Sequence, residues 1–335
     1  MTKNDILNLH TNQRLIVESL LSKGANVRLL DKHDELIEVT YKGKKDFLLD
    51  RFSSSVPYHV VKMTSDKHFT KKFLRDNNIA TPQGEVFTNN TLYNALQYAK
   101  NKYPLVLKPN WGSHGDHVQV NIKNEDQLIN AIDFFVKNTS IKEPFIIEKY
   151  YPWKEYRLFI TSKKGFAVVH REWASIIGNG KSTIEEIIIQ ENEKRKILKS
   201  SSPTSICPIV IDNEVILYLN EQNITNGLQH ILKNGEKLFL RKESNLAKGG
   251  RAIDMTDIVH PSVKKLAYDC LECFPNLPVA GLDLLCEDIT KPMSKDNYVI
   301  IELNSNPGLA MHTYPSEGKS RDVTSLLIDV MFPDL

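Results

Sequence analysis

Two apolar runs near the C-terminal end each contain one acidic residue, and this pair constrains the fold more than any other feature. The first run, 280–285, contains Asp283, and the second, 298–304, contains Glu302 followed by Asn304. Both runs have the length and composition of buried β-strands, and turn-forming residues separate them. A carboxylate inside an apolar strand is unfavourable unless it is ion-paired or binds a cation. The sequence therefore predicts two strands that bring a polar site into a buried sheet.

The polar residues of these strands are candidates for a metal site. Glu302 and Asn304 are two residues apart, so they point the same way from a strand. If Asp283 meets them on one sheet face, three oxygen ligands lie together, and hard oxygen ligands of this kind suit Mg²⁺. The alternative is that Asp283 and Glu302 pair with lysine or arginine in a purely structural network.

Composition excludes several classes of partner and location. The 335 residues include 43 Lys and Arg against 41 Asp and Glu, so the net charge of +2 suggests neither a nucleic-acid nor a membrane partner. No apolar stretch reaches the roughly 18 residues of a membrane helix, and the N-terminus lacks a signal-peptide core. Four cysteines do not form a disulfide framework in a chain of this length. We therefore expect a cytoplasmic protein, in which Cys270 and Cys273 lie on a helix and bind no zinc.

The order of elements favours an α+β protein over a single doubly wound sheet. Strands and helices are mixed without a regular β-α-β repeat. Residues 1–62 have the pattern of a short α/β segment, and residues 190–235 that of a helical or irregular insertion rather than a separate domain. A helix carrying Lys67 is expected after the capping segment 64–66, and a glycine-bearing loop is expected at 245–250.

Lys108 and the acids that follow it suggest a nucleotide site. Lys108 ends an apolar strand immediately before a glycine-bearing loop, where its ammonium could lie along a phosphate chain. The alternative is a β-hairpin with a solvated lysine. Glu148 and Glu155 are seven residues apart and flank a turn, where acids or backbone groups could bind adenine and ribose. A surface salt bridge is the alternative for Glu155.

Taken together, the motifs resemble those of the ATP-grasp superfamily of carboxylate–amine ligases. The likeness is closest to the glutathione-synthetase-type module of bifunctional bacterial glutathione synthetases and to the related module of cyanophycin synthetases. It covers about residues 10–335 and rests on Lys67, 106–109, the glycine loop, 148–155, Asp283 and 302–308, with further similar segments at 176–184, 245–250, 253–257, 259–261 and 311–321.

The resemblance implies a fold and a set of site residues. Two α+β lobes of an ATP-grasp domain, at about 63–180 and 181–335, would clamp ATP, with 1–62 on the substrate side. The ATP-binding residues would be Lys67, Lys108, Gly112, Ser113, His114, Gly115, Glu148, Lys149, Tyr150 and Glu155. Two Mg²⁺ ions, or Mn²⁺ in their place, would be held by Asp283, Glu302 and Asn304. The catalytic candidates are Arg171, Arg241, Asn306 and Gly308, and the substrate loop would include Asn245, Lys248, Gly249 and Gly250.

The implied reaction is the ATP-dependent, ADP-forming joining of an acid to an amine through an acylphosphate. The small-molecule substrates would be amino acids or peptides, with γ-glutamylcysteine plus glycine as the first choice. The alternatives are another amino-acid or dipeptide ligase, as in cyanophycin synthesis, and a catalytically silent nucleotide-binding protein. A homodimer is left open, and the enzyme of any preceding step is expected to be a separate protein.

Two loops depart from the family pattern. In the first, Asp116 and His117 follow Gly115, where relatives often have a basic residue and a glycine. In the second, Lys248 precedes two glycines where relatives usually have hydroxyl residues. We hypothesise that the Lys248 ammonium binds a substrate carboxylate, with a solvated lysine as the alternative. For Arg241 the alternative is a structural role, because Lys242 and Glu243 adjoin it.

Overall fold

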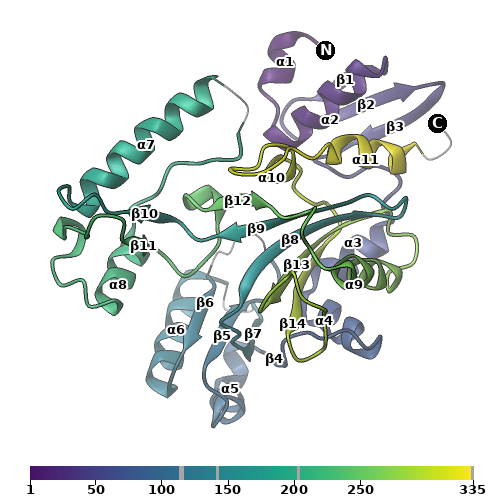
Figure 1. Ribbon diagram of the computed structural model, residues 1–335. Coiled ribbons are helices and arrows are strands. Elements are labelled where there is room, and N and C mark those ends of the chain that lie inside the picture. The colour runs from purple at the N-terminus through teal and green to yellow at the C-terminus, as the bar shows by residue number, and fades with distance from the viewer. Residues whose placement is uncertain (113–116, 141–142, 202–203, 333–335) are drawn as a thin grey trace. The chain divides into compact units, whose positions relative to one another are not determined.

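The computed structural model describes residues 1–112, 117–140, 143–201 and 204–332 (Figure 1). These residues form two compact units. The first comprises Met1–Phe166, Ile258–Gly308 and Thr324–Leu335, and the second comprises Ala167–Asp257 and Leu309–Val323. The two acid-bearing strands belong to the same unit as the residues before 167. The proposed boundaries at 62 and 180 remain predictions.

The N-terminal part of the first unit is a small α/β element, as the sequence predicts. Its elements are α1 (Lys3–Leu7), α2 (Thr11–Ser22) and an antiparallel sheet in the order β1 (Asn26–Asp31), β2 (Leu36–Tyr41) and β3 (Lys44–Leu48). Leu15, Ile16 and Leu20 bury the apolar face of α2. After the helix Gly24 adopts φ 83°, in the left-handed region that glycine tolerates at the end of a helix.

The next part of the first unit is a four-stranded antiparallel sheet with helices packed against it. Two helices precede it, α3 (Tyr58–Ser65) and α4 (Lys67–Asp76), and the sheet order is β4 (Gly84–Phe87), β7 (Phe145–Lys149), β5 (Leu105–Pro109) and β6 (Gln119–Ile122). The 3₁₀ turn η1 (Asn89–Thr91) leads into α5 (Leu92–Ala99), and α6 (Glu125–Asn138) follows β6. Apolar residues of α5 and α6 form one core with the sheet, which fixes strands β5 and β7.

The acid-bearing runs form two neighbouring strands, as predicted. Strand β13 (Val279–Cys286) lies between β8 (Lys154–Thr161) and β14 (Tyr298–Asn304), and it pairs antiparallel with both. Helix α9 (Pro261–Glu272) contacts β8 and β13, and it begins with Pro261 at its first turn. The last helix of the chain is α11 (Val323–Met331).

The second unit has its own hydrophobic core. Its strands pair as β9 (Phe166–Glu172) with β12 (Arg251–Asp254) and as β10 (Ser175–Ile177) with β11 (Lys237–Phe239). Its helical elements are α7 (Ile184–Ser201), α8 (Asn213–Glu221), η2 (Gly227–Gln229), η3 (Leu246–Lys248) and α10 (Ala310–Thr313). Residues 190–235, predicted to be helical or irregular, contain most of α7, all of α8 and η2, and irregular segments. They also contribute buried side chains such as Val215 and Leu219 to a core with Ile184 and Leu240.

Two further features are the membrane-spanning potential of the helices and the state of the cysteines. No helix within the described ranges is long and apolar enough to cross a lipid bilayer. All four cysteines are free thiols. Cys270 is buried in α9, and burial raises the pKa of its thiol. Such a buried thiol suits core packing rather than redox chemistry.

Candidate active site

The strand register brings the three proposed metal ligands to one face of the sheet. Asp283 of β13 lies directly opposite Glu302 of β14, and Asn304 lies opposite Gly281. A register shift follows this pair, because Leu284 pairs with Ile300 and leaves Ile301 as an extra residue in β14. Such a bulge changes the aim of side chains beside it. Alternation therefore predicted the shared face of Glu302 and Asn304, and the pairing of the strands adds Asp283 to it. The bulge left no signal in the sequence.

The Asp283 carboxylate is also half of an ion pair. Arg157 of β8 lies opposite Asp283, and its Nη2 donates to Asp283 Oδ2 at 3.0 Å, with a second hydrogen bond from Nε to Oδ1. Burial alone would lower the pKa of Arg157, but attraction to Asp283 and Glu302 outweighs it and raises the pKa. The structural network considered for these acids therefore exists at Asp283.

The donor set fits a hard divalent cation. Asp283 and Glu302 supply two carboxylates, and Mg²⁺ is usually bound by one or two carboxylates together with substrate phosphates. The buried Nδ2 of Asn304 has no hydrogen-bond partner among the described residues, so this amide is not committed to the protein's own network. Within the same residues no three His, Cys, Asp or Glu side chains form a cluster suited to a metal, so a site would need the amide oxygen.

Two of the proposed phosphate ligands, Lys67 and Lys108, lie close to these acids. Lys67 is the first residue of α4, whose N-cap Asp66 accepts from Phe69 N at 2.8 Å. Its Nζ donates to the Gly112 carbonyl at 2.6 Å. Burial lowers the pKa of Lys67, opposed by attraction to Glu302 and Asp283. Lys108 lies near the same two acids, and although burial would lower its pKa, attraction to Glu148 and these acids raises it.

Sequence reasoning missed Lys71, a third buried lysine beside Lys108. Lys71 is one helical turn after Lys67 in α4, and its Nζ forms an ion pair with Glu148. Lys108 Nζ contacts the other oxygen of the same carboxylate at 2.6 Å. The missed signal was the four-residue spacing of Lys67 and Lys71, which places both on the buried face of one helix. The Glu148 side chain thus orients two lysines, a different contact from the one with adenine that the resemblance implied.

The chain after Glu148 borders an open depression. Its volume is about 330 Å³, and its lining residues are Lys149, Tyr150, Tyr151, Pro152, Trp153, Lys295 and Asp296. The backbone N–H groups of Lys149 and Tyr150 donate to the carbonyls of Gln83 and Pro104. These two N–H groups are therefore already paired within the protein. The depression offers aromatic surface instead, from the rings of Tyr151 and Trp153, whose centroids lie 4.6 Å apart. Glu155, opposite Leu285 in the β8–β13 ladder, keeps its ribose role only as a prediction.

Part of the glycine loop at 112–117, which is predicted to cover the phosphates, lies outside the described residues. That part comprises Ser113, His114, Gly115 and Asp116, whose roles stay predictions. On either side, Gly112 has φ 106° and His117 has φ 59°, both in the left-handed region. A non-glycine residue there costs roughly 1–2 kcal/mol. The His117 ring lies 6.0 Å from the ring of Phe134 and 6.5 Å from that of Phe135, between centroids, so it packs against α6.

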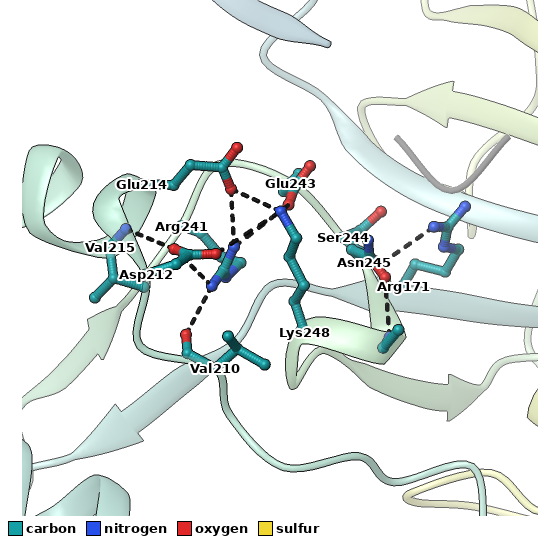
Figure 2. Close-up of polar contacts among 11 residues, drawn as sticks. Arg171, Val210, Asp212, Glu214, Val215, Arg241, Glu243, Ser244, Asn245 and Lys248 are labelled. Atoms are coloured by element: carbon teal, nitrogen blue, oxygen red, sulfur yellow. Dashed lines mark hydrogen bonds and ion pairs between the residues drawn. The ribbon is translucent and has the colours of Figure 1, made fainter. Parts of the chain in front are cut away.

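In the second unit, Arg241 and Lys248 belong to one charged cluster (Figure 2). Arg241 is 1% exposed, and its guanidinium donates to the Val210 carbonyl at 2.8 Å and to the carboxylates of Asp212, Glu214 and Glu243. Lys248 Nζ lies 2.9 Å from Glu214 and 3.1 Å from Glu243. These contacts favour the structural alternative for Arg241. They also give the Lys248 ammonium protein partners, rather than the solvated position or the substrate contact that the sequence suggested.

Backbone geometry fixes the substrate loop beside this cluster. The Asn245 side chain accepts from Ala247 N at 2.9 Å and caps η3, and Gly249 then adopts φ 102°. Arg195 of α7 donates to the Gly249 carbonyl at 2.9 Å and to that of Cys207 at 2.7 Å. Arg171 of β9 donates to the carbonyl of Ser244 at 3.2 Å, just before the loop (Figure 2). Sequence reasoning named Arg171 but missed Arg195, which lies in a polar helix with a weak periodic pattern.

Comparison with known proteins finds similarity to ATP-grasp proteins. A family model described as a RimK-like ATP-grasp domain matches residues 160–319. Cyanophycin synthetase of Geminocystis herdmanii is 33% identical over 300 residues, which cover 89% of this chain and 34% of that protein. A glutathione biosynthesis bifunctional protein of Clostridium perfringens is 28% identical over 334 residues, covering 97% of this chain and 41% of that protein.

A solved structure extends the likeness to nearly the whole chain. The bifunctional glutathione synthetase of Pasteurella multocida matches with a TM-score of 0.70 and 26% sequence identity, over 98% of this chain and 45% of that one. The chain thus spans less than half the length of these relatives. The predicted fold class, α+β of the ATP-grasp type, is confirmed. This chain has the ATP-grasp fold, and its residues 160–319 match the RimK-like ATP-grasp domain.

Proposed function

We propose that the chain is an ATP-dependent, ADP-forming ligase that joins a carboxylate to an amine. One observation carries the proposal: the first unit gathers Lys67 and Lys108 within electrostatic reach of Asp283 and Glu302. Cations for phosphate oxygens and acids for divalent ions are the two requirements of phosphoryl transfer from ATP. The names of the relatives, cyanophycin synthetase and bifunctional glutathione synthetase, support the same class of reaction.

The chemistry follows from the poor reactivity of a carboxylate toward amines. An oxygen of the acid substrate attacks the γ-phosphorus of ATP, the bond to the β-phosphate oxygen breaks, and ADP leaves. The amine then attacks the carbonyl carbon of the acylphosphate, phosphate leaves with the bonding electron pair, and the nitrogen loses a proton. Bound Mg²⁺, or Mn²⁺, would supply neutralisation of phosphate charge.

The residues of the chain supply position and charge for these steps. Lys67 and Lys108 would hold phosphate oxygens, while Asp283, Glu302 and Asn304 would hold one or two divalent ions. Glu148 keeps Lys108 in place, since its carboxylate contacts the Lys108 ammonium at 2.6 Å. Asn306 and Gly308, directly after the metal strand, and Arg171 in the second unit remain the candidates for contacts to the reacting groups. The acylphosphate is sensitive to water, so the site has to exclude it.

For the substrates we propose γ-glutamylcysteine as the acid and glycine as the amine. The relatives named for glutathione biosynthesis align with 97% of this chain in one case and 98% in another, and this supports the choice. The cyanophycin synthetases are more identical over a shorter part, which keeps a different amino-acid or peptide pair as the second candidate. We also propose that the protein acts in the cytoplasm on these small molecules, without nucleic acid or membrane, alone or as a homodimer.

The test is a measurement of nucleotide products against a panel of acid and amine pairs that includes γ-glutamylcysteine with glycine. We expect ADP and phosphate in equal amounts, and only when both substrates and Mg²⁺ are present. Formation of AMP and pyrophosphate would indicate an acyl-adenylate and contradict the acylphosphate mechanism. Binding of ATP without product from any pair would favour a silent nucleotide-binding protein.

A further inference from the structure

The turn at residues 49–52 brings an arginine to the C-terminal end of β14, the strand that carries the proposed metal ligands Glu302 and Asn304. Leu49 and Phe52 exchange both backbone hydrogen bonds, which leaves Asp50 and Arg51 at the tip of the turn. Asp50 has φ 54°, in the left-handed region. A non-glycine residue held there is strained, and such strain is often found where a turn presents a functional group.

Arg51 and Asp50 hold Asn306 from both sides. Arg51 Nε donates to the Asn306 carbonyl at 2.9 Å, and the Asn306 side-chain amide donates to Asp50 Oδ2 at 3.1 Å. Arg51 Nη1 closes the ring by donating to Asp50 Oδ1 at 2.7 Å. These bonds join parts of the chain 255 residues apart, and Asn306 is only two residues beyond Asn304. The N-terminal segment therefore supplies a fixed cation beside the metal strand.

The Nη2 edge of the Arg51 guanidinium is available to bind a group from outside the chain. The Arg51 side chain is 17% exposed, and its Nη2 has no hydrogen-bond partner in the described parts of the chain. A planar guanidinium with an open edge matches the geometry of a carboxylate. Burial lowers the pKa of Arg51, attraction to Asp50 opposes this, and repulsion from nearby Arg157 lowers the pKa further. An anion at the open edge of Arg51 would add to the attraction that Asp50 supplies.

We propose that Arg51 binds a second, non-reacting carboxylate of the acid substrate and so selects acids that carry two carboxylates. The proposal rests on the ligase function given above. The reacting carboxylate is a poorer candidate, because a guanidinium bound to it would withdraw the charge needed to attack phosphorus. Arg51 is fixed to Asn306, two residues beyond Asn304. From there its guanidinium would anchor the far end of the acid and leave the reacting carboxylate toward the phosphate. Asp50 is the positioning residue that holds the guanidinium plane.

The experiment compares two acids and two arginine variants. The acids are γ-glutamylcysteine, which has a second carboxylate, and its analogue in which the glutamyl α-carboxylate is an amide. Arg51→Met removes the guanidinium, and Arg51→Gln can still donate to the Asn306 carbonyl if the first variant folds poorly. Arg28→Met is the matched control, because Arg28 lies in the same N-terminal element, 66% exposed, and pairs with Glu38. The readouts are kcat and KM for each acid and for ATP, together with the melting temperature.

With the parent protein, we expect γ-glutamylcysteine to be used well and the amide analogue poorly. Arg51→Met and Arg51→Gln should lower kcat/KM for γ-glutamylcysteine by roughly 10- to 100-fold, mainly through KM, the range expected when one charge-assisted hydrogen bond is lost. Their kcat/KM for the amide analogue and their KM for ATP should stay within about twofold of the parent, and so should every constant of Arg28→Met.

Three outcomes would overturn the proposal. An equal fall in kcat for both acids would mean that Arg51 only supports Asn306. If the parent uses the amide analogue as well as γ-glutamylcysteine, the second carboxylate is not recognised, although the ligase function stands. If the parent releases no ADP with any acid of the panel, the ligase function is rejected, and the proposed role of Arg51 is rejected with it.

Discussion

At the scale of single residues, Glu148 holds one negative charge between two ammonium groups. The side chains of Glu148, Lys71 and Lys108 are all buried, and both lysines contact the one carboxylate. Burial alone would raise the pKa of Glu148, but the two lysines outweigh it and lower the pKa. The carboxylate is therefore ionised at neutral pH, and without it two buried cations would face each other.

Removing this charge should be costly. We expect Glu148→Gln to lower the free energy of unfolding by about 3–5 kcal/mol, the usual effect of leaving a buried charge without its partner. Adding Lys71→Met to that variant should recover part of the loss, because one of the two cations is removed. Glu18→Gln is the control, since its surface pair with Arg14 in α2 is expected to contribute less than about 1 kcal/mol. Denaturant unfolding measures all four proteins, and equal losses for Glu148→Gln and Glu18→Gln would contradict the assignment.

The pH dependence of stability gives a second prediction for this trio. Burial lowers the pKa of Lys71 from 10.5 to about 8. Between these values the unfolded chain binds more protons at this position than the folded one, so the free energy of unfolding rises with pH there and is flat below about pH 8. Relative to Lys71→Met, the parent should gain on the order of 1–3 kcal/mol between pH 7.5 and 10. Parallel pH profiles for the two proteins would reject the lowered pKa.

At the scale of elements, the loop after η3 depends on the backbone of Gly249. Its φ of 102° is in the glycine region, and a Cβ there would lie 2.6 Å from Ile209 Cα. Gly235 offers a matched control, because it has φ 80° but nothing within 4 Å of an added Cβ. The two positions thus separate backbone strain from steric overlap.

Alanine at these two positions should therefore have unequal effects. Gly235→Ala is expected to cost roughly 1–2 kcal/mol from the left-handed backbone alone. Gly249→Ala should cost more, on the order of 1–3 kcal/mol beyond that, because Ile209 backbone has to move. Thermal or denaturant unfolding gives both values. A Gly249→Ala protein no less stable than Gly235→Ala would show that the segment around Ile209 does not pack on the loop.

At the scale of the whole molecule, ligand binding should stabilise the fold in a metal-dependent way. ATP at about 100 times its Kd stabilises a protein by about 2.7 kcal/mol when only the folded state binds. We expect a rise in the melting temperature with ATP and Mg²⁺ and a smaller rise with ATP and a chelator. Glu302→Gln should lose most of the Mg²⁺-dependent part, while Glu18→Gln keeps it. An equal ATP effect with and without Mg²⁺ in the parent would remove Glu302 from the proposed metal site.

The sequence by itself determined what depends on local pattern. Alternation along 298–304 placed Glu302 and Asn304 on one face, and the capping segment 64–66 marked the start of α4, with Asp66 as the N-cap. Apolar runs bounded by turns identified the central strands, since each buried strand has to be apolar along its own length. The motif order, spread over almost the whole chain, was sufficient for the α+β ATP-grasp fold.

Only the tertiary structure decided which side chains share a charge. Glu148 binds Lys71 and Lys108, Lys248 meets acids up to 36 residues away in sequence, and Arg51 reaches Asn306. The core of the second unit also depended on folding, because its apolar residues are spread over weakly periodic helices. Such pairings leave no pattern along the chain, since the energy of a buried charge depends on which groups the fold brings within a few ångströms of it.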